Sequence, residues 1–203
     1  MPPAIMLLRS SAATSFRGLR AMRGLLLALI LGLCLPLMGQ SLPALPGTVT
    51  RVLDGDTADG QLASGPIRVR FNGIDTPEKN QPWGHEATEA LSRMIAGKHV
   101  QLEPFEQDKY ERMIANVILD NLGVNAEMVR QGHAWAYRKY MKRENAVLCT
   151  LEDAARKARR GLWSLPKHDW IAPWDWRHLK TRADPIDYSH ETVADCVAAI
   201  GKR

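Results

Sequence analysis

Apolar side chains recur at every second position in several short segments that follow residue 46. Five segments are rich in residues that favour strands: residues 47–53, 58–62, 67–71, 100–105 and 114–119. In the third of them, Ile67, Val69 and Phe71 share one face, because successive side chains of a strand point to opposite sides. The pattern therefore predicts strands that pack one face on a core, with Arg70 on the other face.

Three other segments have apolar residues three and four positions apart, which is the spacing of one face of an α-helix. They are residues 85–96, 125–131 and 147–158. Gly97, Gly132 and Gly161 follow and are expected to end these helices, and Asn125 is expected to cap the second one. Strands interleaved with helices in this way predict an α+β fold, a five-stranded OB-fold β-barrel with three packed α-helices.

Residues 1–41 have the pattern of a secretory signal segment. Three arginines precede an apolar run at residues 25–37, and small residues follow at positions 39 and 41. The run is shorter than the roughly 20 residues that span a bilayer. We expect cleavage, export to the periplasm or the medium, and no stable membrane association afterwards. An uncleaved anchor is the alternative, and translation from Met22 would keep the pattern intact.

The charge of the exported part is nearly balanced. The chain has 27 Lys and Arg and 22 Asp and Glu, but residues 1–41 contain four arginines and no acid. The remaining 23 bases therefore face 22 acids, and net charge gives no argument for a nucleic-acid partner. Roughly 160 residues suit one globular domain. We expect that domain at residues 42–163, a Trp-rich extension at residues 164–203, and a monomer.

Export also bears on the cysteines, since cleavage would leave only Cys149 and Cys196. Disulfides form in oxidising compartments, so the two residues are a candidate pair that ties the carboxyl-terminal tail to the last helix. Two separate thiols are the alternative. The tail tryptophans are expected to pack the extension against the barrel, although stacking on bases would also suit them.

Acidic residues gather at two predicted turns. Asp56 lies in the turn after the first strand, and Asp75, Thr76 and Glu78 lie in the turn after the third. Pro77 stiffens the second turn because a proline restricts the residue before it. Crowded carboxylates repel each other and resist desolvation, so a fold that gathers them needs a cation. Both turns are therefore candidates for one phosphodiester-cleaving site.

Five ordered motifs resemble the thermonuclease (micrococcal nuclease) family. They are residues 52–57 (VLDGDT), 70–78 (RFNGIDTPE), 108–112 (DKYER), 129–134 (VRQGHA) and 161–163 (GLW). One such motif is weak evidence, whereas five with matching spacing are specific. The resemblance covers about residues 46–163. It implies an OB-fold that carries a calcium-dependent phosphodiesterase, which cleaves DNA and RNA and leaves 3′-phosphates.

The resemblance also implies a role for each matching residue. Asp56 and Asp75 would bind calcium through their carboxylates, and Thr76 through its backbone carbonyl. Glu78 would activate the attacking water. The other implied residues are the phosphate-binding Arg70 and Arg112 and the nucleotide-contacting Lys109, Tyr110, Tyr137 and Tyr140. Glu111 departs from the family, which often has a glycine or another turn-former at this position. Glu111 could therefore alter the turn or pair with Arg112.

The chemistry of these residue types agrees with the resemblance. Calcium takes about six to eight oxygen ligands, so two carboxylates and a carbonyl leave places for water and a phosphate oxygen. Planar guanidinium groups match the charged oxygens of a phosphodiester under attack. A glutamate within reach of the attacking water can accept its proton.

Two other functions remain open at this point. The first is an OB-fold module that holds single-stranded nucleic acid without cutting it. The second is an envelope structural protein that docks through its tryptophan-rich extension. Two basic runs begin at Arg138 and Arg156, and they are expected either on solvated faces or against phosphates.

Overall fold

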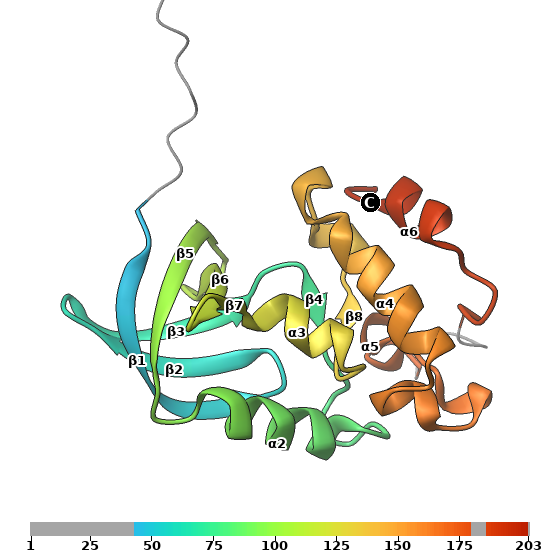
Figure 1. Cartoon of the computed structure of the whole chain (residues 1–203), viewed down its shortest axis with the longest axis horizontal. Coiled ribbons are helices and arrows are strands. Elements are labelled where there is room, and N and C mark those ends of the chain that lie inside the picture. The colour runs from blue at the N-terminus through green and yellow to red at the C-terminus, as the bar shows by residue number, and fades with distance from the viewer. Residues whose placement is uncertain (1–42, 180–185, 203) are drawn as a thin grey trace, which may run out of the picture. The chain divides into compact units, whose positions relative to one another are not determined.

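The computed structural model describes residues 43–179 and 186–202, which belong to one compact unit over residues 42–203. The predicted signal segment lies outside the described residues. Within the described ranges, no helix is long and apolar enough to cross a membrane. Figure 1 shows the barrel strands on one side of this unit, and α4, α5 and α6 on the other.

Five strands close a β-barrel, as predicted. They are β1 (Leu45–Asp54), β2 (Thr57–Leu62), β3 (Gly65–Phe71), β5 (His99–Gln107) and β6 (Met113–Leu119). Antiparallel neighbours follow the order β3-β2-β1-β5-β6, and parallel pairing of β3 with β6 closes the barrel. Two smaller ladders join β7 (Leu122–Gly123) to β6, and β4 (Ile74–Asp75) to β8 (Trp135–Ala136).

The three predicted helices are present as α2 (Gly84–Ile95), α3 (Val124–Arg130) and α4 (Val147–Lys157). Helix α2 packs against β1 and buries Ala87, Leu91 and Ile95, which the helical spacing places on one face. The extension adds α5 (Pro173–Trp176) and α6 (Val193–Ala199). Four 3₁₀ turns complete the described helices: η1 (Arg138–Tyr140), η2 (Arg143–Asn145), η3 (Gly161–Ser164) and η4 (Lys167–Asp169).

Asn125 does not cap α3, so that prediction is wrong. Gly123 is the N-cap residue, and Asn125 is buried in the first turn. Its Oδ1 accepts a hydrogen bond from the Val117 backbone N–H at 2.9 Å, and its Nδ2 donates to the Asn72 carbonyl at 3.0 Å. The side chain satisfies buried backbone groups of the barrel, and it thereby joins α3 to β6 and to the loop after β3.

The extension packs into the core of the unit. Cys149 of α4 and Cys196 of α6 are buried and form a disulfide. Trp170 meets the ring of Trp163 edge-on at 5.2 Å between centroids, in a hydrophobic cluster that also contains Trp135. The extension therefore contributes to the folded core, but Trp170 and Trp174 pack in a cluster separate from that of the barrel residues, and not against the barrel as the sequence analysis expected.

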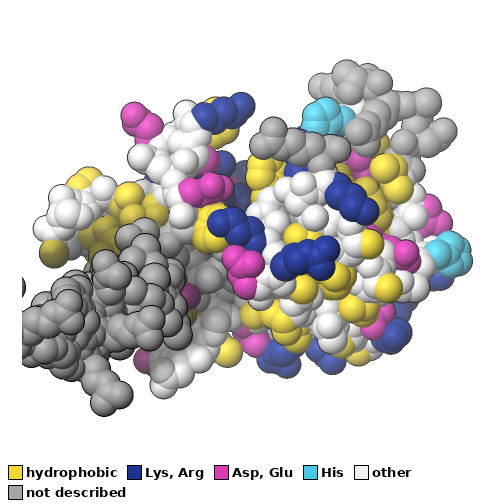
Figure 2. Space-filling model, turned by 90° about the horizontal axis from the view of Figure 1, so that it is seen from above, with side chains coloured by type: hydrophobic (Ala, Val, Ile, Leu, Met, Phe, Trp, Pro, Cys, Tyr) yellow, Lys and Arg dark blue, Asp and Glu magenta, His cyan; other side chains and the backbone are white. Residues whose placement is uncertain are grey.

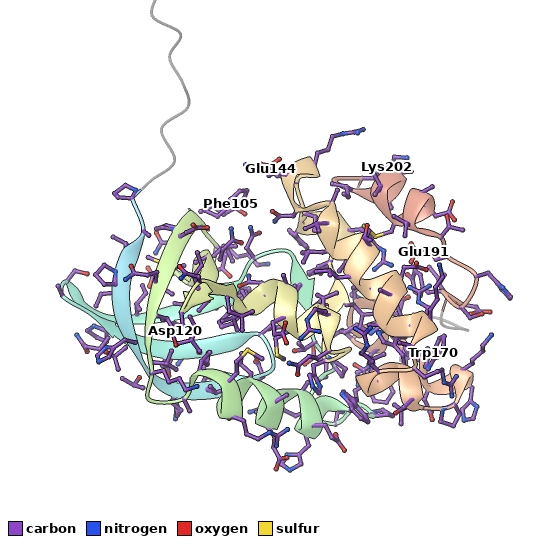
Figure 3. The ribbon with its side chains drawn as sticks, in the orientation of Figure 1. Phe105, Asp120, Glu144, Trp170, Glu191 and Lys202 are labelled. Atoms are coloured by element: carbon purple, nitrogen blue, oxygen red, sulfur yellow. A yellow bond between two sulfur atoms is a disulfide. The ribbon has the colours of Figure 1, made fainter. Side chains whose placement is uncertain are left out.

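A buried network of charged side chains also holds the extension. Glu152 of α4 accepts hydrogen bonds from Arg138 and Arg156. Glu191 of the extension, which is labelled beside α4 in Figure 3, pairs with Arg138. Arg138 and Arg156 are buried, so the expectation that they lie on solvated faces or against phosphates is wrong for both. The two acids balance the two bases, which offsets much of the cost of burying them.

Removing one charge from this network should destabilise the protein. We expect Glu152→Gln to lower the free energy of unfolding by about 3–5 kcal/mol, because it leaves buried guanidinium charge without its partner. Urea denaturation measures the loss. The matched control is Glu89→Gln, which breaks exposed pairs on α2 and should cost no more than about 1 kcal/mol. Equal losses in the two variants would contradict the stabilising role of the network.

Candidate active site

One cleft of about 780 Å³ collects all the residues that the sequence analysis singled out for chemistry or substrate binding. Its lining includes Asp56, Arg70, Asp75, Thr76, Glu78, Lys109, Tyr110, Arg112, Tyr137 and Tyr140. These residues come from the barrel strands, from the turns after β1 and β4, from the loop between β5 and β6, and from the segment after β8. The fold thus brings together side chains that lie up to 84 positions apart in the chain, Asp56 and Tyr140.

Arg70 bridges the two aspartates. It lies in β3, and its Nε is 3.1 Å from Asp56 Oδ1 while its Nη2 donates to Asp75 Oδ1 at 3.0 Å. Its Nη1 donates to the carbonyls of Phe71 and Ile74, both at 2.8 Å. Burial opposes the charged form, but Asp56 and Asp75 raise the pKa of Arg70 above its usual value. Arg70 points away from the barrel core as predicted, and it is buried among carboxylates instead of being solvated.

The two acidic turns are joined directly. Asp56 Oδ2 accepts hydrogen bonds from the Thr76 backbone N–H at 2.8 Å and from its hydroxyl at 3.0 Å. A Cβ at Gly55 would lie 2.8–2.9 Å from the Thr76 side chain, so glycine permits this close approach. Burial, together with the neighbouring Asp56, raises the pKa of Asp75 to about 6 against the opposing effects of Arg70 and Arg177. Additional positive charge beside Asp56 and Asp75 would therefore offset the unfavourable burial of their carboxylates.

Backbone contacts fix the loop that carries Glu78, while its carboxylate stays accessible. The Glu78 N–H donates to Gln81 Oε1 at 3.1 Å. A Cβ at Gly84 would lie 1.9 Å from the Glu78 carbonyl oxygen, so the start of α2 packs directly against the loop. The Glu78 side chain is 39% exposed, which allows water to reach it.

Asp108 positions the second arginine of the site. Its Oδ2 is 2.7 Å from Arg112 Nε, and its Oδ1 accepts from the backbone N–H groups of Tyr110 and Arg112 at 2.8 and 3.0 Å. Glu111 has a φ of 61°, which is a left-handed conformation that costs a residue with a side chain about 1–2 kcal/mol. The turn therefore forms despite the departure at Glu111, and Asp108 is the acid that pairs with Arg112.

Aromatic rings line the rim of the cleft. Tyr110 and Tyr140 are 67% and 56% exposed, and Tyr140 meets the ring of Tyr137 edge-on at 4.8 Å. Lys109 Nζ lies 4.9 Å from the centre of the Tyr110 ring. Exposed aromatic faces beside cations are suited to stacking on unpaired bases of a nucleic acid.

Asp54 and Arg177 also line the cleft, although neither had a predicted role. Asp54 Oδ1 accepts from the Asp56 N–H at 3.1 Å, and burial together with Asp56 raises the pKa of Asp54 to about 6. Its position as the first acid of the turn was the available signal. Arg177 of the extension pairs with Asp75 and Glu78, each at 2.7 Å. Its segment has no periodicity and lies outside the resemblance, so no sequence pattern indicated this contact.

The oxygen donors of the cleft fit a hard cation. Among the described residues, no group of three or more His, Cys, Asp or Glu side chains could hold a metal on its own. Asp56 and Asp75 supply two buried carboxylates, and the adjoining Thr76 can supply a carbonyl. Oxygen ligands of this kind suit calcium or magnesium, with water and substrate completing the shell.

Comparison with known proteins decides the family. Residues 68–165 match the family model described as "Staphylococcal nuclease homologue". The chain is 42% identical over 135 residues to an "Uncharacterized endonuclease" of Escherichia coli O157:H7, which covers 66% of this chain and 86% of the relative. The chain belongs to the staphylococcal nuclease family. The family assignment and the OB-fold barrel predicted from the sequence are thus confirmed.

Two further relatives are similar to this chain. A "Micrococcal nuclease" of Shigella flexneri is 38% identical over 146 residues, covering 68% of this chain and 83% of the relative. "Protein ParB" of Escherichia coli is 39% identical over 142 residues, covering 66% and 79%. The family model and the relatives described as endonuclease and micrococcal nuclease support a nuclease, an enzyme that hydrolyses phosphodiesters of nucleic acids.

The strain at Glu111 gives a stability prediction. We expect Glu111→Gly to raise the free energy of unfolding by about 0.5–1 kcal/mol, since glycine removes the left-handed penalty and adds some unfolded-state entropy. Thermal denaturation checks this. Lys109→Gly is the matched control in the same loop, where φ is negative. It should lower the stability by about 0.4–1 kcal/mol, and a loss of stability in Glu111→Gly would contradict the strain argument.

Proposed function

We propose that this protein is an exported, calcium-dependent endonuclease that hydrolyses DNA and RNA and leaves 3′-phosphates. The observation that carries the proposal is the Arg70 bridge between Asp56 and Asp75, in a cleft that also contains Glu78 and Arg112. Family membership supports the nuclease activity. The oxygen donor set supports the choice of calcium.

The residues of the cleft suggest how the reaction proceeds. Glu78 accepts a proton from a water molecule, whose oxygen attacks the phosphorus in line with the 5′-oxygen of the next nucleotide. The bond from phosphorus to that oxygen breaks, the 5′-oxygen leaves with the electron pair and takes a proton from solvent, and a 3′-phosphate remains. Arg112 and Arg70 stabilise the charge on the phosphate oxygens. Calcium held by Asp56, Asp75 and the Thr76 carbonyl would supply fixed positive charge beside the phosphate.

Substrate binding rests on local groups of the cleft. Lys and Arg side chains lie interspersed with acidic and hydrophobic ones on the face shown in Figure 2, without forming a continuous basic surface there. The exposed rings of Tyr110 and Tyr140 offer stacking surfaces, and stacking tolerates any base. We infer a preference for unpaired strands and little sequence specificity.

The proposal of export rests on two observations. The pattern of residues 1–41 is that of a signal segment. The disulfide between Cys149 and Cys196 is the kind of bond that persists in oxidising compartments outside the cytosol. Calcium is also far more plentiful outside cells, so export and the proposed cofactor are consistent with each other.

Cleavage of single-stranded DNA by the purified protein tests the mechanism. We expect calcium to support cleavage, EDTA to abolish it, and Glu78→Gln to slow it by about 10²–10⁴-fold, because the water loses its proton acceptor. A gel assay follows the products. Cutting that survives both EDTA and Glu78→Gln would disprove the mechanism. Binding without cutting in every condition would favour the non-cleaving OB-fold module, and neither binding nor cutting would favour a structural protein.

The phosphate-binding role of Arg112 gives a second prediction. Arg112→Ala should lower the rate of cleavage by about 10²–10³-fold, as expected for the loss of a donor to the charged oxygens of the transition state. Steady-state rates on a short oligonucleotide measure the change. Arg51→Ala removes an equal charge from an exposed pair outside the cleft and should leave the rate unchanged. A fall of the same size in both variants would argue against a specific role for Arg112.

A further inference from the structure

The C-terminal extension places a third guanidinium in the cleft. Arg177 follows α5, and its Nη2 donates to Asp75 Oδ2 at 2.7 Å while its Nη1 donates to Glu78 Oε1 at 2.7 Å. A longer contact of 3.3 Å joins Nη2 to the Tyr137 hydroxyl. Arg177 lies beyond the family match, which ends at residue 165. This side chain therefore contacts the proposed metal carboxylate and the proposed proton acceptor from outside the region that matches the family.

The extension holds Arg177 in place on both sides. The ring of Trp174 stacks on Tyr137, with 5.2 Å between centroids and 4° between planes. Trp176 Nε1 donates to Asn80 Oδ1 at 3.2 Å, in the loop that carries Glu78. The same loop is tied to the extension by Gln81, whose Nε2 donates to the Ile171 carbonyl at 2.6 Å. The position of Arg177 is thus built into the packing of the extension.

Both carboxylate oxygens of Asp75 accept hydrogen bonds from guanidinium groups. The two guanidinium groups differ in how easily they can move away from Asp75. Oδ1 accepts from Arg70 at 3.0 Å, and Oδ2 accepts from Arg177 at 2.7 Å. The Arg70 side chain is only 12% exposed and is also tied to two backbone carbonyls, whereas Arg177 is 36% exposed. Arg177 can therefore turn into solvent without leaving a buried charge unpaired, and Arg70 cannot.

We propose that Arg177, which pairs with both Asp75 and Glu78, is an internal cation that competes with the metal for Asp75, so that metal binding requires its guanidinium to leave. The inference rests on the proposed calcium-dependent function. In the absence of metal, Arg177 neutralises carboxylates that would otherwise repel each other. When metal binds, the released guanidinium is free to meet a phosphate of the substrate. Arg177 thereby lowers the affinity of the protein for calcium, and it couples metal binding to the movement of its own side chain in the extension.

Calcium binding by the purified full chain tests this inference without an activity assay. Isothermal titration should give a dissociation constant about tenfold lower for Arg177→Gln than for the wild type, if Arg177 occupies the carboxylates in about nine molecules of ten. Arg93→Gln is the matched control, because it removes the same charge from an exposed pair on α2. Its dissociation constant should equal that of the wild type.

Thermal unfolding provides a second readout and shows that the variant folds. In EDTA, Arg177→Gln should melt at a lower temperature than the wild type, because Asp75 and Glu78 lose their counter-ion. Calcium should then raise its melting temperature by more than it raises that of the wild type. An equal or weaker calcium affinity in Arg177→Gln would overturn the inference, even if calcium-dependent cleavage is intact. The absence of calcium binding in all proteins would overturn the proposed function and this inference together.

Discussion

The bridge that Arg70 makes between Asp56 and Asp75 is the interaction on which the site depends. Two buried carboxylates near each other are unfavourable, and a planar guanidinium that spans both relieves the repulsion. Arg70 is anchored by carbonyls at the end of β3 and by pairing of that strand, so the barrel sets where the carboxylates lie. Thr76 then donates to Asp56, which fixes the turn leading to Glu78. The pairing of the barrel strands therefore also determines the geometry of the site.

The barrel, its three helices and ten cleft residues were predictable because each depends on a local pattern or an ordered motif. Asn125 was predicted wrongly because capping is a local rule, and its side chain instead satisfies strand backbone groups far away in the chain. Arg138 and Arg156 were predicted wrongly for a related reason. A basic run on a helix indicates solvent unless buried acids face it, and Glu191 lies more than thirty positions beyond them.

The extension adds a charged side chain to the cleft of the nuclease-like domain. Its disulfide, its tryptophans and the Glu152 network anchor a segment whose sequence shows no periodicity. The result of that anchoring is a guanidinium, Arg177, held at the open side of the carboxylate pair. No sequence rule predicts such a contact, because the extension is positioned by packing and the pairing residues lie about 100 positions away. The proposed competition between Arg177 and the metal would link metal affinity to a part of the chain beyond the family match.

Anomalous diffraction from crystals of the protein grown with calcium would test the central claim, that the carboxylates bridged by Arg70 form a metal site. The account predicts an anomalous peak bound to the carboxylates of Asp56 and Asp75 and to the Thr76 carbonyl, with the Arg177 guanidinium turned away from Asp75. A peak elsewhere in the molecule, with Arg177 still paired to Asp75 and Glu78, would contradict it.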